Sequence, residues 1–237
     1  AANYHFLLQV ITYIKYFSHL SKKRNGDFSA LAGDFLAILV SFPPLAIFRG
    51  NESPGAIVVG AEKGKSMKEH KAAAPLSGGN LETILKVGQF ALTAETSPPD
   101  SADPEAVLAR TRCLKGLADA VNVLDGPGAQ THLSPLASAA IMARAGIEPV
   151  LQFTMRDRNR LALEADILGA GVLGIPNILC LTGDSPEAGD QPEAKPVFDL
   201  NSAQFMGIVN DMRTQAVFPG GRTIETPPRL LIGAADA

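Results

Sequence analysis

The stretch Ile178-Leu179-Cys180-Leu181-Thr182 is a short, mostly apolar run that leads through Gly183 into Asp184. Four further runs of this kind also reach an acid: Phe90–Ala94 reaches Glu95, Ala120–Leu124 reaches Asp125, Val150–Thr154 reaches Asp157, and Leu230–Ala234 reaches Asp236. Such runs are typical of β-strands that are covered on both faces, as in a parallel sheet. The C-terminal ends of parallel strands share one face, where sites are built. We therefore expect the acids to converge on one pocket.

The spacing of these runs predicts the fold class. Strands are predicted at about 90–95, 120–124, 149–154, 177–182 and 229–235, with helices at about 81–87, 103–115, 134–146, 157–174 and 201–215. The first four strands start about 30 residues apart, which is the length of one βαβ unit. A (β/α)8 barrel needs about 250 residues, and fewer follow residue 90. We predict an α/β protein with a partial (β/α)8 TIM barrel of about five of the eight strands.

Capping residues support the predicted helix starts. Asp103-Pro104-Glu105 combines an N-cap, a proline at the first helical position and an acid in the first turn, and Ser134-Pro135 resembles it. Asp157 is placed to cap the third of these helices, and Asn201 or Ser202 the fourth.

The first 48 residues differ in composition from the rest, because they contain all three tyrosines and six of the eleven phenylalanines. We interpret residues 1–66 as a poorly ordered N-terminal extension that is unrelated to the barrel, and residues 67–237 as an incomplete barrel. Met67 is a hypothetical native start, which would leave residues 1–66 outside the native protein. An unclosed barrel exposes strand edges, so we expect the chain as given to be unstable and inactive.

Bulk properties exclude several classes of partner. The net charge of −3 gives no electrostatic reason for binding nucleic acid or an anionic membrane. No segment reaches the ~20 consecutive apolar residues of a membrane-spanning helix. Cys113 and Cys180 lack metal-type spacing, and we interpret both as buried thiols in a reducing, cytoplasmic compartment. The four histidines are scattered and form no metal-ligand set.

Several residues near the predicted strand ends allow two interpretations. Glu95 could cap a helix or form a salt bridge, or it could be a proton donor or acceptor whose pKa is raised by burial. The long segment 185–201 is either a surface insertion or a functional loop. His132 is either an ordinary loop residue or a ligand contact. The three arginines of residues 156–160 either lie at a solvent-exposed helix start or bind a phosphate.

Five segments, in this order, resemble the methylenetetrahydrofolate reductase family. They are Phe90-Ala-Leu-Thr-Ala-Glu-Thr-Ser-Pro-Pro99, Ala120-Val-Asn-Val-Leu-Asp125, Glu148-Pro-Val-Leu-Gln-Phe-Thr-Met-Arg-Asp-Arg-Asn159, Leu179-Cys-Leu-Thr-Gly-Asp184 and Gly189-Asp-Gln-Pro-Glu-Ala-Lys-Pro-Val-Phe-Asp-Leu200. The resemblance covers residues 81–237, about two-thirds of the chain, and residues 1 to about 66 take no part in it.

This resemblance implies a (β/α)8 barrel that holds FAD at the C-terminal strand ends. It implies reduction of 5,10-methylenetetrahydrofolate to 5-methyltetrahydrofolate with NADH or NADPH, in one-carbon and methionine metabolism. Glu95 and Asp184 match the family's catalytic, folate-binding acids. The implied flavin contacts are Leu124, Asp125, Gln152, Thr182, Gly183, Asp184, Phe198 and Asp199. We also expect a homo-oligomer or a complex with a partner subunit.

The chain departs from the family at two of these positions. Leu124 stands where a threonine is common, which removes one flavin hydrogen bond, and Gln152 stands where some members have a histidine. Two other functions remain open: a TIM-barrel lyase that uses the acids to hold a divalent metal, and a non-catalytic subunit of a methyl-transfer complex.

Overall fold

A computed structural model describes residues 38–40 and 76–235, and it contains one six-stranded sheet in the order β1-β2-β3-β4-β5-β6. Five strands run parallel: β2 (Leu92–Thr96), β3 (Ala120–Val123), β4 (Pro149–Thr154), β5 (Asn177–Leu181) and β6 (Leu231–Ala234). The short strand β1 (Ile38–Val40) pairs antiparallel with the free edge of β2. The predicted parallel sheet is therefore confirmed, and β1 is an element that the sequence pattern did not predict.

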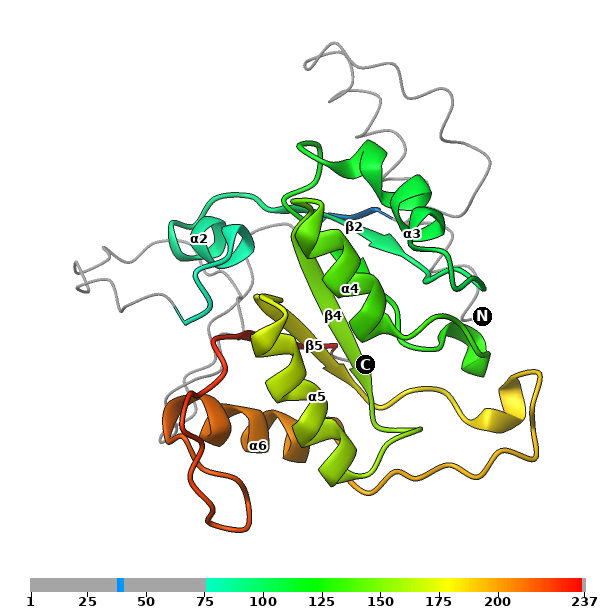
Figure 1. Cartoon of the computed structure of the whole chain (residues 1–237), viewed down its shortest axis with the longest axis vertical. Coiled ribbons are helices and arrows are strands. Elements are labelled where there is room, and N and C mark those ends of the chain that lie inside the picture. The colour runs from blue at the N-terminus through cyan, green and yellow to red at the C-terminus, as the bar shows by residue number, and fades with distance from the viewer. Residues whose placement is uncertain (1–37, 41–75, 236–237) are drawn as a thin grey trace, which may run out of the picture.

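Helices connect the strands in the predicted alternation. They are α2 (Asn80–Lys86), α3 (Pro104–Thr111) with the 3₁₀ turn η2 (Arg112–Leu114), η3 (Pro127–Ala129), α4 (Pro135–Arg144), α5 (Arg160–Val172), η4 (Pro186–Ala188) and α6 (Ser202–Thr214). Figure 1 shows α4 and α5 lying across the same face of β4. The arrangement is that of a partial (β/α)8 barrel. The rest of the predicted extension and Met67 lie outside the described residues, and no described helix is long and apolar enough to cross a membrane.

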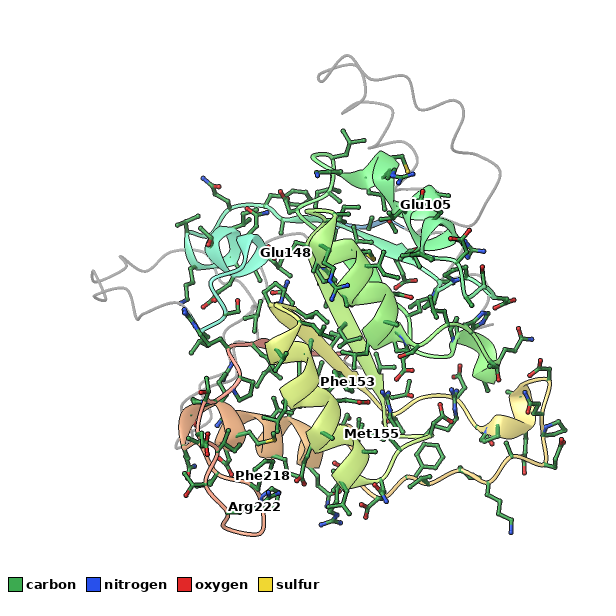
Figure 2. All side chains as sticks on the ribbon, viewed as in Figure 1. Glu105, Glu148, Phe153, Met155, Phe218 and Arg222 are labelled. Atoms are coloured by element: carbon green, nitrogen blue, oxygen red, sulfur yellow. The ribbon has the colours of Figure 1, made fainter. Side chains whose placement is uncertain are left out.

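Alternate residues along the strands form the core beneath the helices. Val121 and Val123 of β3 and Leu151 and Phe153 of β4 are at most 1% exposed and belong to one apolar cluster. The ring of Phe153 packs against Phe205 of α6 with a centroid distance of 5.5 Å. Figure 2 shows Phe153 and, two residues further along the chain, Met155 in the region where α5 covers β4. Burying a side chain of this size contributes about 2 kcal/mol.

The residues between these core positions face the other side of the sheet, because side chains alternate along a strand. Glu95 of β2 is in register with Asn122 of β3, which is in register with Val150 of β4. One step toward the C-terminal strand ends, Leu124 and Gln152 follow the paired residues Val123 and Leu151. We call this surface the inner wall, since it is the face that a closed barrel would enclose.

Helix caps agree with the sequence except at α5. The side chain of Asp103 accepts a hydrogen bond from Glu105 N, and Asn201 forms a capping box with Gln204. The prediction that Asp157 caps α5 is wrong. Asn159 is the cap, with its Oδ1 accepting from Ala162 N at 3.1 Å, because the Asp157 carboxylate is occupied by Arg156.

The two cysteines differ in environment. Cys180 is buried on the helix-covered face of β5, and burial raises the pKa of its thiol to about 12. The prediction of a buried thiol is wrong for Cys113, which is exposed. The reason is local: α3 ends at Thr111 and continues as the 3₁₀ turn η2, so Cys113 does not lie on the buried stripe of a longer α-helix.

Two acids hold α2 against the N-terminal ends of the strands. The Glu148 carboxylate accepts from Asn80 N at 2.6 Å and from Leu81 N at 2.8 Å, and it lies at the start of β4 beside α2 (Figure 2). The Glu82 carboxylate, 2% exposed, accepts from Lys86 and from the backbone N–H groups of residues 76, 77 and 78. Burial alone would raise the pKa of Glu82, but these donors outweigh it and hold the pKa far below its usual range.

Replacing Glu82 by Gln should lower the free energy of unfolding by about 2 kcal/mol, because charge-assisted hydrogen bonds to a buried group are lost. Since folding depresses the pKa of Glu82, its contribution is present above the unfolded pKa and is lost as the pH falls toward the folded value. Urea unfolding at neutral and acidic pH measures both effects. Glu105→Gln is the control, because the Glu105–Arg112 pair is solvent-exposed; equal losses in the two variants would contradict the prediction.

Candidate active site at the C-terminal strand ends

Glu95 is a half-buried acid on the inner wall. Its neighbours along β2, Ala94 and Thr96, are 1% and 7% exposed, and the Glu95 side chain alternates to the opposite face. No described residue donates a hydrogen bond to its carboxylate, and burial raises its pKa. A carboxyl group of this kind retains its proton at a higher pH than an exposed glutamate does, so it can act as a general acid. The structure thus places Glu95 where the sequence predicts a functional acid.

Leu124 and Gln152 lie side by side on the inner wall, closer to the C-terminal strand ends than Glu95. Leu124 N donates to Thr96 O at 3.1 Å, which fixes the exit of β3 against β2. Gln152 is 5% exposed, and no described residue hydrogen-bonds its side-chain amide. Together they present an apolar surface next to a buried amide. A flat heteroaromatic ring would find stacking contacts and hydrogen-bonding groups there.

Asp125 follows directly and has a different environment. One of its carboxylate oxygens accepts from Thr154 N at 2.8 Å and from Thr154 Oγ1 at 3.0 Å, and it also pairs with Arg158. Arg158 makes a second ion pair with Asp166 of α5 at 3.0 Å. The predicted cofactor residue Asp125 therefore joins the end of β3 to the end of β4 and to α5.

The segment Thr182-Gly183-Asp184 leaves β5 at the same edge of the sheet. Gly183 has φ +91°, and a Cβ there would lie 3.0 Å from Thr154 Cβ, so glycine lets the backbone pass close to β4. Asp184 is exposed, and its backbone carbonyl accepts from Arg156 at 3.5 Å. The backbone at the β5 exit is therefore held by Arg156 and passes close to Thr154 of β4.

The arginine cluster of residues 156–160 is paired with acids. Arg156, 4% exposed, donates from Nε and Nη2 to Asp157 at 2.7 Å each, which raises the pKa of Arg156. Arg160 pairs with Asp199. Arg158 is held by two acids, as described above. Because each of the three guanidinium groups is paired with an acid, this arrangement does not support the hypothesis that they bind a phosphate.

The loop between β5 and α6 is held by Asp199. Both oxygens of this carboxylate accept from the Arg160 side chain at 2.9 Å, and Oδ2 also accepts from Arg160 N, the first residue of α5. These bonds lower the pKa of Asp199 to about 2. Phe198 precedes it with φ +41° and is 40% exposed. Of the two predicted flavin contacts in this loop, Phe198 presents its ring to solvent and Asp199 is an anchor.

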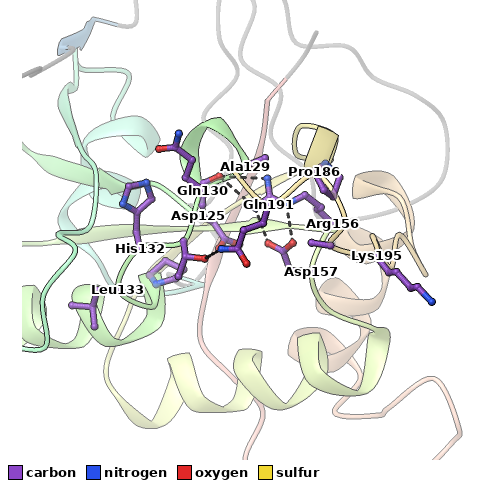
Figure 3. Close-up of a pocket in the computed structure, with 14 residues that line it drawn as sticks. Asp125, Ala129, Gln130, His132, Leu133, Arg156, Asp157, Pro186, Gln191 and Lys195 are labelled. Carbon is purple, nitrogen blue, oxygen red and sulfur yellow. Dashed lines mark hydrogen bonds and ion pairs between the residues drawn. The ribbon is translucent and has the colours of Figure 1, made fainter. Parts of the chain in front are cut away.

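A cavity of about 250 Å³ lies between the loops that follow β3, β4 and β5 (Figure 3). Gln191 bridges to Thr131 across it at 3.2 Å, while Lys195 points away from the other lining side chains. His132 also lines it, and its Nδ1 lies 2.5 Å from Asp100 Oδ1. Of the predicted strand-end residues, Asp125 and Asp157 line this cavity together with part of the long loop, whereas Glu95, Leu124 and Gln152 do not.

The predicted residues thus fall into two sets. Glu95, Leu124 and Gln152 share the inner wall, and Thr182, Gly183 and Asp184 leave β5 at the C-terminal edge of the sheet, whereas Asp125 and Asp199 anchor loops. Sequence reasoning missed Asn122, which is 7% exposed beside Glu95. A polar residue in the middle of an otherwise apolar run was the signal that could have found it. Among the described residues, no three His, Cys, Asp or Glu side chains lie close enough together to hold a metal.

The fold and the site define a class: a parallel α/β barrel-type enzyme with acids at the C-terminal strand ends. A family model described as methylenetetrahydrofolate reductase matches residues 80–217, which is more than half of the chain. The chain therefore belongs to the methylenetetrahydrofolate reductase family. No curated protein matches the chain significantly.

Replacing Asp199 by Asn should loosen the loop, because the paired charge on Arg160 loses its partner. We expect faster backbone hydrogen exchange across residues 184–200 and in the first turn of α5, measured by mass spectrometry. Asp190→Asn is the matched control, since Asp190 is an exposed acid in the same loop. Unchanged exchange in the Asp199 variant would show that the ion pair does not hold the loop.

Proposed function

We propose that the chain forms the flavin-binding part of an enzyme that reduces 5,10-methylenetetrahydrofolate to 5-methyltetrahydrofolate. NADH or NADPH is the reductant, and the reaction belongs to one-carbon and methionine metabolism. The observation that carries the proposal is Glu95, a half-buried acid with a raised pKa on the inner wall, next to the surface formed by Leu124 and Gln152. Membership of the family supports the same reaction.

The residues of the inner wall fit FAD. Leu124 supplies an apolar contact, Gln152 supplies a buried amide that no described residue hydrogen-bonds, and Gly183 lets the β5 exit approach closely. Bound FAD would supply the two-electron chemistry, accepting hydride from the nicotinamide and passing it to the folate. We propose that Thr182, Gly183 and Phe198 line this site as well. For Asp125 and Asp199 we propose a supporting role, because their carboxylates are committed to holding loops.

The two predicted acids would act differently. Glu95 holds a proton in a desolvated position and delivers it to the folate nitrogen as the five-membered ring opens. Asp184 is exposed at the β5 exit, so its carboxylate stays solvated and negative. A negative charge near the cationic iminium of the opened folate would stabilise it. Burial therefore separates an acid that donates a proton from one that contributes charge.

The absorption spectrum tests the flavin. The protein, reconstituted with FAD, should show the visible bands of an oxidised flavin. These bands should bleach with NADH or NADPH and return with 5,10-methylenetetrahydrofolate. A protein that stays colourless after reconstitution would overturn the proposal in favour of a non-catalytic subunit, and metal-dependent turnover without a flavin would favour a lyase.

Replacing Glu95 by Gln should slow reoxidation of the reduced flavin by the folate about 10²- to 10⁴-fold, the usual cost of losing a general acid. Bleaching by the nicotinamide should keep its rate, because that step takes no proton from Glu95. In the wild type, the folate step should slow as the pH rises through the raised pKa of Glu95, since the protonated form donates. Stopped-flow measurement of each half-reaction separates the two steps. Equal slowing of both would show that Glu95 supports the fold or the flavin instead.

A further inference from the structure

Helix α5 carries an apolar stripe on the side that faces away from the sheet. Four residues share this face at the helical spacing i, i+4, i+7 and i+11: Leu161, Ala165, Leu168 and Val172. The buried residues of α5 lie on the opposite face and belong to the core. Leu161 and Val172 are 71% and 87% exposed, the highest values among the large apolar residues of the described chain. We call these four residues the outer stripe, since apolar residues gathered on one exposed face mark an interaction site.

The outer stripe carries no charge. Two of the three charged residues of α5, Arg160 and Asp166, are held in ion pairs. The third, Glu164, is only 8% exposed. Helix α3, in contrast, exposes Glu105 and Arg110, as expected for a helix whose outer face meets solvent. A partner with a charged surface would find no opposite charge on the stripe, whereas an uncharged apolar surface such as the stripe itself fits it.

The stripe continues into an apolar groove at the C-terminal end of α5. The groove has a volume of about 640 Å³ and lies between the last turns of α5 and the loop that leads from α6 to β6, which passes beside α5 in Figure 1. Leu168 and Val172 belong to both the stripe and the groove, and Phe218 and Ile224 line the groove from the loop. Three exposed charged residues of the loop also line it: Arg222, Glu225 and Arg229. Apolar residues bordered by charged ones are the usual composition of a protein interface.

We propose that the outer stripe and the groove form the interface of a two-fold symmetric dimer of this chain, with the two copies of α5 antiparallel. Residues at equal distances from the middle of the helix then meet, so Leu161 of one protomer lies against Val172 of its partner, and Ala165 lies against Leu168. Each contact occurs twice, as two-fold symmetry requires. The antiparallel arrangement brings Leu161, which protrudes at one end of the helix, to the groove at the other end. The small Ala165 leaves room for Leu168 at the centre.

The size of the surface also supports this arrangement. A helix of 13 residues is about 20 Å long and about 10 Å wide, so two stripes alone cover less than the ~800 Å² per partner of a stable dimer. The groove is lined by 16 residues, and a specific interface uses roughly 20–30 residues on each side. Stripe and groove together therefore approach the size that a dimer needs, and the inner wall on the other side of the sheet stays open.

Sedimentation velocity of the 237-residue chain over a range of protein concentrations tests the dimer. The wild type should form a dimer that dissociates on dilution. Leu161→Lys and Val172→Glu should each raise the dissociation constant at least about tenfold, because an unpaired charge enters the interface twice. Val87→Glu is the matched control and should leave the constant unchanged, since Val87 is 64% exposed but follows α2, outside the stripe and the groove. All three positions are exposed, so equal thermal unfolding midpoints should show that the variants keep the fold.

The double variant with both Leu161→Lys and Val172→Glu tests the antiparallel arrangement. It should associate more tightly than either single variant, because each lysine then faces a glutamate of the partner protomer, and added salt should weaken this association. A dimer that neither single variant affects would be held elsewhere and would overturn the proposal, as would a double variant that associates no better than the single ones. A wild-type chain that stays monomeric at every concentration would assign the stripe to a different protein and would also overturn it.

Discussion

The parallel register of β2, β3 and β4 is the constraint on which the candidate site depends. Side chains alternate along each strand, so a register that buries Val121, Val123 and Leu151 beneath the helices also commits the residues between them to the inner wall. A slip of one residue in β3 would exchange the two faces and take Asn122 away from Glu95. The same register therefore determines both which residues pack in the core and which residues line the candidate site.

Acids at the strand ends divide between support and chemistry. Asp125 and Asp199 accept several hydrogen bonds each, and Asp157 is paired with Arg156, so these acids tie the strand ends and the long loop to α5. Glu95 and Asp184 have no such partners among the described residues. A carboxylate whose lone pairs are already occupied has little capacity to bind a ligand or move a proton, whereas an unpartnered one does. All of these acids follow predicted strands in the sequence, but the hydrogen bonds that each carboxylate accepts distinguish supporting acids from acids available for chemistry.

Much of the fold could be predicted because continuous apolar runs recur at a βαβ spacing. The strand positions, the helix order and the Asp103 and Asn201 caps follow from that pattern and from local capping chemistry. Details that depend on a distant partner could not be predicted. Asp157 and Asn159 are both good caps, and only the buried Arg156 decides between them. Cys113 is exposed because α3 tightens into a 3₁₀ turn, and β1 is a three-residue strand outside the repeating pattern. Asn122 interrupts an apolar run, and only the register of β2 and β3 shows that it lies beside Glu95.

The inner wall also shows a conflict between stability and function. Burying an acid or an amide without a hydrogen bond costs stability, typically 1–3 kcal/mol for each group. The described chain satisfies Glu148 and Glu82 at the N-terminal end of the sheet, whereas no described residue hydrogen-bonds the side chains of Glu95 and Gln152 further along β2 and β4. Packing alone gives no reason for this asymmetry between the two ends of one sheet. A ligand that hydrogen-bonds these side chains would account for it, because its binding would offset that cost.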